Sequence, residues 1–297
     1  MKILIAISSK EYSGSTLSLG MKVASALKAS TTILDVGEKI SEFGSKDVSI
    51  ANQLMESWDF NRPGVEVLEW AHEFLSKNNF IEIDENEEEK FKNKLVENES
   101  NRAEVYLKGK IGNNLSLILR NGDIIGELRS EVQYGHYDVT IIGGSGKRSM
   151  SHDLIQYIDS SIFVVKDFDP KNNYKILLVV DGLPNIQSVL RYGVRIAQAF
   201  NIDLDFITIS KEKKLSKEYE SVMKYVAKYM RRCKVKYNGL HDTGNPKEKI
   251  INAADNNHII VMGASTKSPI AKFFKGSIPL DVMKSCNCPI LIVKSKN

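Results

Sequence analysis

Short apolar runs alternate along this chain with longer stretches in which apolar residues recur every three or four positions. The alternation is most regular from about residue 174 onward, where it is typical of strands and amphipathic helices in turn. It predicts strands over 175–180, 204–209, 233–237, 258–262 and 290–294, and helices over 185–199, 214–230, 246–256 and 278–285. Because strands and helices alternate, we expect doubly wound, open parallel sheets with helices on both faces.

The first half follows the same plan less regularly. Its opening run, Lys2–Ile7, matches Lys175–Val180, and its ending YDVTIIGG…SSIFVVK matches NHIIVMGA…NCPILIVK at the end of the chain. Such an internal repeat predicts two tandem domains, residues 1–168 and 174–297, joined by the polar stretch DFDPKNN. Residues 84–99 are acid-rich, and we interpret them as a mobile insertion or an extended surface helix.

Each predicted domain ends in an apolar strand, at 161–165 and at 289–293. Two such strands left as open edges would invite aggregation. We therefore expect the halves to pack as a pseudo-two-fold pair through these final strands, and a homodimer of the whole chain stays open.

The last forty residues place glycines and hydroxyl groups between a strand end and a helix start. A small-residue loop begins at Gly263, and Ser277 stands at an N-cap position two residues before Pro279. Backbone N–H groups at the start of a helix, together with the helix dipole, can hold an anion.

Charge divides unevenly between the halves. Residues 171–297 carry 22 lysines and arginines against 10 acidic residues, a net charge of +12, whereas residues 1–170 carry −8. The opposite charges can dock the halves together, or the basic half can hold a polyanionic ligand. The basic stretch 211–236 is interrupted by glutamates and is typical of the solvated side of a helix. We therefore expect no nucleic-acid partner. No apolar run is long enough for a membrane span, and we expect a cytoplasmic protein.

These features together resemble the universal stress protein family in a tandem, two-domain form. The resemblance rests on KILLVVDG, the Gly-Asn-Pro turn at 244–246, IIVMG, the glycine loop and CPILIV. Nucleotide-binding members of the family resemble G-x2-G-x9-G-[ST] at that loop. Gly263, Gly276 and Ser277 fit this spacing, while Thr266 stands at the second glycine and offers a hydroxyl.

The resemblance implies that the second half binds ATP or another adenine nucleotide, with Mg²⁺ accompanying the phosphates. Asp181 matches the family's adenosine-contacting aspartate, and Ile209 matches a position that flanks the base. The resemblance thus implies the following nucleotide-binding residues: Asp181, Ile209, Met262, Gly263, Ser265, Thr266, Gly276, Ser277 and Ile278.

The first half departs from this pattern. Ser8 stands where the second half has Asp181, and the stretch between Gly143 and Ser161 is eight residues shorter than the stretch between Gly263 and Pro289. We interpret this half as a degenerate domain that binds no ATP.

Catalytic residues are not evident in the sequence. No Ser/His/Asp or Cys–His arrangement stands out, and no cysteine or histidine cluster has the spacing of metal ligands. Three functions remain open: a nucleotide-binding stress-response or regulatory protein, a nucleotide-independent scaffold that binds a partner, and a slow ATP hydrolase.

Overall fold

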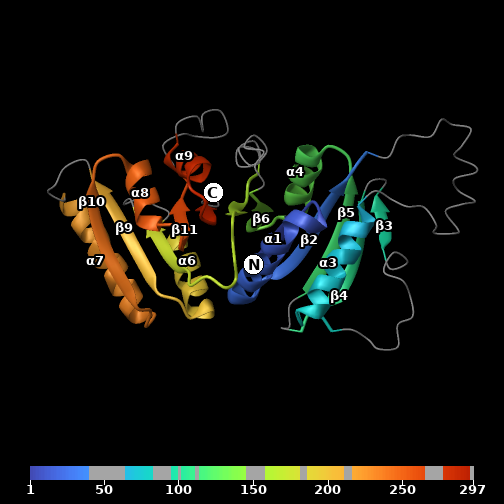
Figure 1. Cartoon of the computed structure of the whole chain (residues 1–297), viewed down its shortest axis with the longest axis horizontal. Coiled ribbons are helices and arrows are strands. Elements are labelled where there is room, and N and C mark those ends of the chain that lie inside the picture. Colours follow the sequence, from blue (N-terminus) through green and yellow to red (C-terminus); the bar gives the residue numbers. More distant parts are fainter. Residues whose placement is uncertain are drawn as a thin grey trace, which may run out of the picture.

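The protein is described by a computed structural model. It covers residues 1–39, 64–82, 95–99, 102–110, 114–144, 158–180, 186–210, 216–264 and 277–294, and all structural statements concern these residues. The two halves lie side by side, with the second half on the left in Figure 1. The division into domains at 1–168 and 174–297 stays a prediction.

The first half begins with the strand–helix–strand unit that its apolar pattern predicts. Its elements are β1 (Lys2–Ile7), α1 (Lys10–Leu27), β2 (Ser30–Gly37), α3 (Val65–Lys77), β3 (Val96–Glu99), β4 (Arg102–Lys108), β5 (Asn114–Asn121), α4 (Ile124–Gly135), β6 (Val139–Gly143) and β7 (Ser161–Val165).

The second half follows the predicted alternation of strands and helices closely. Its elements are β8 (Lys175–Val179), α6 (Ile186–Phe200), β9 (Leu204–Ser210), α7 (Lys217–Arg232), β10 (Tyr237–Thr243), α8 (Pro246–Ala254), β11 (His258–Gly263), α9 (Ile278–Ser285) and β12 (Ile290–Val293). Helix α9 has the predicted bounds, since Ser277 is its N-cap and Pro279 lies in its first turn.

The described strands form one twelve-stranded sheet in the order β10-β9-β8-β11-β12-β7-β6-β1-β2-β5-β4-β3. Within the second half, β8 lies between β9 and β11, and all neighbouring strands are parallel. The first half repeats this order from β7 to β5, so the doubly wound plan that the sequence predicts is present twice.

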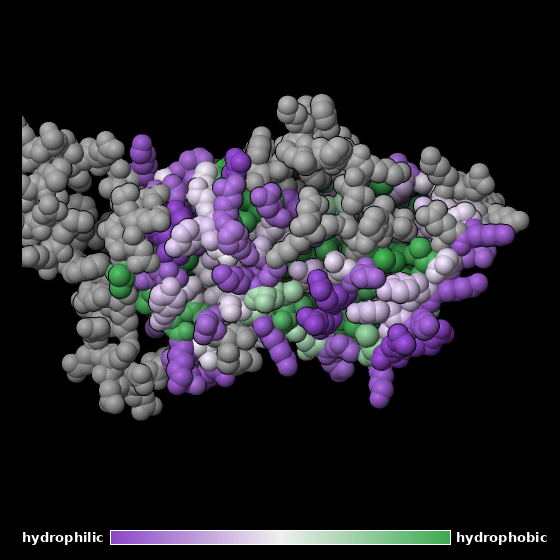
Figure 2. Space-filling view, turned by 180° about the vertical axis from the view of Figure 1, so that it is seen from behind, coloured by the Kyte–Doolittle hydropathy of each residue, from purple (hydrophilic) through white to green (hydrophobic). Residues whose placement is uncertain are grey.

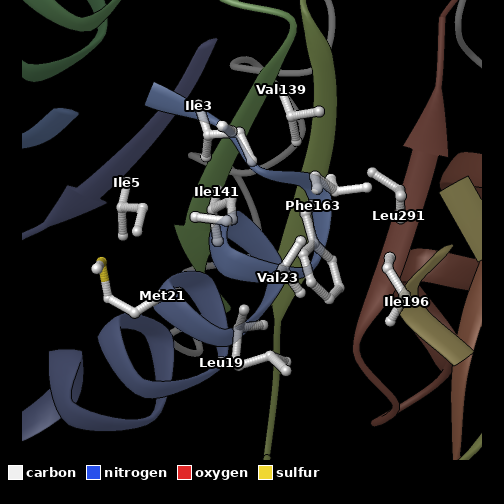
Figure 3. Packing of buried hydrophobic residues seen from close by; sticks show 14 of the residues in the cluster. Ile3, Ile5, Leu19, Met21, Val23, Val139, Ile141, Phe163, Ile196 and Leu291 are labelled. Atoms are coloured by element: carbon white, nitrogen blue, oxygen red, sulfur yellow. The ribbon is translucent and has the colours of Figure 1, made fainter. Parts of the chain in front are cut away.

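Strands β7 and β12 join the two halves within the sheet. They pair antiparallel, with Leu291 opposite Phe163 at the centre of the register. Figure 3 shows Phe163 with Val23 of α1 on one side and Ile196 of α6 on the other. The side chains of Phe163, Leu291, Val23 and Ile196 are all buried, so the hydrophobic core continues from one half into the other.

Helices cover both faces of the sheet. Buried side chains of α1, α3, α6 and α7 belong to one hydrophobic cluster, and those of α4, α8 and α9 belong to the other. Seen from behind, the molecule shows mostly hydrophilic side chains, with small hydrophobic areas between them (Figure 2). Because helices cover both faces of the sheet, we expect a ligand at the carboxyl ends of the strands, as in other open α/β sheets.

Three sequence-based expectations need correction. The strand expected at 233–237 is β10, which begins at Tyr237, because α7 continues to Arg232 and Lys234 turns the chain with a φ of 54°. The acid-rich stretch 84–99 ends in a strand, β3, rather than in a helix, while residues 84–94 lie outside the described part and the insertion itself stays a prediction. Strands β3 and β4 extend the parallel sheet in antiparallel fashion beyond β5.

Candidate functional site

The carboxyl ends of the second half's strands lie level with one another. Val179 of β8 pairs with Met262 of β11, and Met262 pairs with Ile292 of β12. On the other side of β8, Val179 pairs with Ile207, so Ile209 lies two residues further along β9. In an open parallel sheet, this edge of the central strands is the usual place for ligand binding.

Two apolar residues of the predicted site border this edge from the sheet. Met262 is almost fully buried and belongs to the cluster under α8 and α9, so it supports the edge from the core. Ile209 is only partly buried and packs against the same cluster. Gly263 ends β11 beside Val293, and the following Ala264 N–H donates to the Val293 carbonyl at 2.8 Å. Of these residues, Ile209 is the apolar side chain that a flat ligand could touch.

Ser277 brings a polar group to the same edge at the start of α9. Its backbone has N-cap geometry, with φ of −79° and ψ of 135°, but its side chain makes no capping hydrogen bond. The Oγ atom is buried, and no partner for it exists among the described residues. Burying a hydroxyl without a hydrogen bond is unfavourable. The adjoining Ile278 is 41% exposed, whereas Pro279 in the same turn is buried.

Four of the predicted site residues cannot be placed in this geometry. Asp181, Ser265, Thr266 and Gly276 lie outside the described residues. The predicted loop is therefore described only at its two ends, Gly263 and Ser277.

Two pairs of polar side chains at this edge were not predicted from the sequence. Ser210 Oγ lies 2.9 Å from His241 Nε2, and Lys249 Nζ lies 2.9 Å from a carboxylate oxygen of Asp242. The hydrogen bond from Lys249 lowers the pKa of Asp242. The sequence signal was the polar strand His-Asp-Thr directly before the Gly-Asn-Pro turn, which places three polar residues at the end of β10 beside β9.

Comparison with known proteins decides the family of this half. Residues 173–294 match the model of the universal stress protein family. The second half of this chain belongs to the universal stress protein family. A universal stress protein of Methanocaldococcus jannaschii is 31% identical over 86 residues, which are 28% of this chain and 53% of that protein. The chain thus spans about half the length of this curated relative.

Solved structures extend the likeness of fold to the whole chain. A universal stress protein from Archaeoglobus fulgidus superposes with a TM-score of 0.65 at 13% identity, covering 100% of this chain and 97% of that chain. A functionally unknown protein from Pseudomonas aeruginosa reaches a TM-score of 0.58 at 13% identity, covering 99% and 92%. At this identity, the likeness concerns the fold.

The first half has a crevice at the corresponding edge of its own strands. It encloses about 300 Å³ and is lined by Ser8, Ser13 and Thr16 among others. Ser13 Oγ accepts hydrogen bonds from the Ser8 and Ser9 N–H groups, and Ser9 Oγ accepts from Tyr12 N–H. Side chains of the protein itself thus satisfy donors at the start of α1.

Gly144, which follows β6 in the first half, has a packing reason. A Cβ on Gly144 would lie 2.3 Å from Cγ of Lys166 and 3.1 Å from the Val165 carbonyl oxygen. Lys166 is itself held across the junction, since its Nζ donates to the carbonyls of Met283 and Cys286 at the end of α9. These contacts account for Gly144 without a ligand.

The cysteines and histidines of the described chain form no metal site together with acidic residues. Cys286 and Cys288 are buried, and Cys233 is half-buried. His258 lies 2.8 Å from the Ala254 carbonyl through Nδ1 and 3.1 Å from Asp205 through Nε2, at the opposite end of β11 from the site. Each ring nitrogen of His258 thus has a partner within the core, so this histidine has a packing role away from the site. No described helix is long and apolar enough to cross a membrane.

Proposed function

We propose that the universal stress protein domain binds an adenine nucleotide, foremost ATP, and acts as a stress-response or regulatory module. The observation that carries the proposal is the buried Oγ of Ser277, which has no partner among the described residues at the start of α9. A hydroxyl and N–H groups at a helix start are suited to a phosphate oxygen.

The remaining groups at this edge fit the other parts of a nucleotide. The half-buried Ile209 offers an apolar surface to the base, and the net charge of +12 over residues 171–297 favours a polyanion. Asp181 would accept a hydrogen bond from the ribose or the adenine amine. Ser265, Thr266 and Gly276 would complete the phosphate loop between Gly263 and Ser277, and Mg²⁺ would be held chiefly by the phosphates.

Titration of the full chain with a fluorescent ATP analogue tests this assignment. Asp181→Ala removes one charge-assisted hydrogen bond of about 1.5–3 kcal/mol, so the Kd should rise tenfold to a hundredfold. Ser277→Ala should have a smaller effect because neighbouring N–H groups remain, and Gly276→Val a larger one because it blocks the loop.

Ser8→Ala in the first half is the matched control for Ser277→Ala and should leave the Kd unchanged. Equal losses from Ser8→Ala and Ser277→Ala would contradict a site confined to the second half. An absence of binding at millimolar ATP would favour the nucleotide-independent scaffold. Sustained phosphate release that is lost in Asp181→Ala or Ser277→Ala would instead reveal a slow ATP hydrolase.

A further inference from the structure

A second hollow lies at the opposite edge of the sheet from the proposed nucleotide site. We call it the junction groove, and its volume is about 530 Å³. It lies at the amino ends of the strands, where α1 and α6 end and where the connection between the halves enters β8. A volume of this size is within the range of small-molecule sites, which occur preferentially at domain boundaries.

Aromatic rings form much of the wall of the junction groove. Four of its twelve described lining residues are aromatic: Phe80, Phe168, Tyr174 and Phe200. They come from the first half, the connection and the second half, so the groove exists only where these three parts meet. Rings arranged in this way favour a flat apolar ligand, which can stack on them or meet their edges.

The connection between the halves is held in place along the groove. The rings of Phe168 and Tyr174 stack with their centroids 5.0 Å apart and their planes 23° apart. The Tyr174 hydroxyl accepts a hydrogen bond from Asp169 N–H at 3.1 Å. A ligand entering the groove would therefore meet a preformed wall, which lowers the entropy loss on binding.

The charge on the groove wall favours a ligand with a negative charge. Lys22 of α1 is the one charged residue among the described lining residues, and it is exposed. The remaining polar lining, Ser25 and Asn172, is neutral. The carbonyl groups at the end of α1 are partly satisfied, because Lys28 N–H donates to Ser25 and Ala29 N–H donates to Ala24. An anionic group near Lys22 would thus find a cation beside an apolar wall.

We propose that the junction groove binds a small organic anion with a flat apolar body. Its rings lie against the aromatic wall and its charged group lies near Lys22. Because both halves contribute to the groove, such a ligand would hold the halves together at the edge opposite to the nucleotide. The proposal is independent of nucleotide binding.

The full chain can be tested with 8-anilinonaphthalene-1-sulfonate, a flat aromatic sulfonate whose fluorescence rises in apolar surroundings. We expect saturable binding of one molecule per chain that saturating ATP does not displace. Lys22→Glu reverses the charge at the groove and should weaken binding on the order of tenfold or more. Lys224→Glu, at an exposed lysine of α7 outside the groove, is the matched control and should leave binding unchanged.

A steric variant makes the test independent of charge. Ala199→Trp places a large ring from an exposed position into the groove and should abolish binding, while circular dichroism verifies that the fold is kept. Equal effects of Lys22→Glu and Lys224→Glu, unchanged binding in folded Ala199→Trp, or displacement of the dye by ATP would each overturn the proposal. So would an absence of saturable binding to the unaltered chain.

Discussion

Replacing Glu131 by glutamine should destabilise the first half strongly. Glu131 lies on α4, is fully buried, and accepts hydrogen bonds from three side chains. The Nε atoms of Arg102 on β4 and Arg120 on β5 lie 3.1 Å and 2.8 Å from it, and the Tyr137 hydroxyl lies 3.1 Å away. Both arginines are about 4% exposed, so the carboxylate compensates two buried guanidinium groups.

The size of the expected destabilisation follows from the burial of Glu131 and its two arginine partners. Burial alone would raise the pKa of Glu131, but hydrogen bonds and charge from Arg102 and Arg120 outweigh it and hold the pKa below its usual 4.5. Removing one member of a buried ion network costs about 3–5 kcal/mol. Glu104 still pairs with Arg102 at 2.9 Å and Glu127 with Arg120 at 3.2 Å, so the loss comes from the carboxylate that both buried arginines share. Since the folded-state pKa is lowered, this contribution is present above pH 4.5 and is lost as the pH falls through the folded-state pKa.

Urea unfolding followed by tryptophan fluorescence measures this loss, because both tryptophans, Trp58 and Trp70, lie in the first half. Glu73→Gln is the matched control: it breaks a pair with Lys77 at 3.3 Å whose side chains are 63% and 75% exposed. Such an exposed pair contributes only about 0.3–0.5 kcal/mol. Similar free-energy losses in Glu131→Gln and Glu73→Gln at pH 7 would refute the role of the buried network.

Further predictions concern pH and packing. Burial, with a smaller contribution from Glu66, raises the pKa of Asp35 to about 7. The folded state therefore binds more protons than the unfolded state between pH 3.8 and about 7, and stability falls as the pH rises through this window. Asp35→Asn should lose this dependence in urea titrations at pH 4 to 8; an unchanged slope would contradict the assignment. A Cβ on Gly193 would lie 2.2 Å from Leu178 Cδ2, so Gly193→Ala should destabilise by about 1–3 kcal/mol in thermal unfolding. In α1, a Cβ on Gly14 would have no described atom within 4 Å apart from its chain neighbours and the helix's own backbone, so Gly14→Ala should stabilise by about 0.5–1 kcal/mol, and a loss there would count against the packing described.

The second half could be predicted well because its elements carry local signals. Ser277 and Pro279 marked the start of α9, and continuous apolar runs marked β8, β11 and β12. Strand β10 was misplaced because it is an exposed edge strand, Tyr-Asn-Gly-Leu-His-Asp-Thr, that buries little and so lacks an apolar pattern.

The first half was harder to predict because contacts distant in sequence shape its edge. The antiparallel β3–β4–β5 extension buries charged residues on its strands, and Arg102 is stabilised there by Glu131, 29 residues away. Sequence analysis takes charged residues as exposed, so it cannot predict a buried ion pair such as Arg102 with Glu131. At the candidate site, Ser277 could be predicted as an N-cap. That its buried hydroxyl has no partner within the described part of the chain depends on how the fold packs, which the sequence pattern does not reveal.

Native mass spectrometry of the full chain with ATP tests the central claim most directly. Because the second half carries a helix start whose Ser277 hydroxyl has no partner among the described residues, and the first half has a shortened loop, we expect one nucleotide per chain. Ser277→Trp should lose the bound nucleotide, and Ser8→Trp should keep it. Two nucleotides per chain, or loss of binding in folded Ser8→Trp with retention in Ser277→Trp, would contradict a single site in the second half.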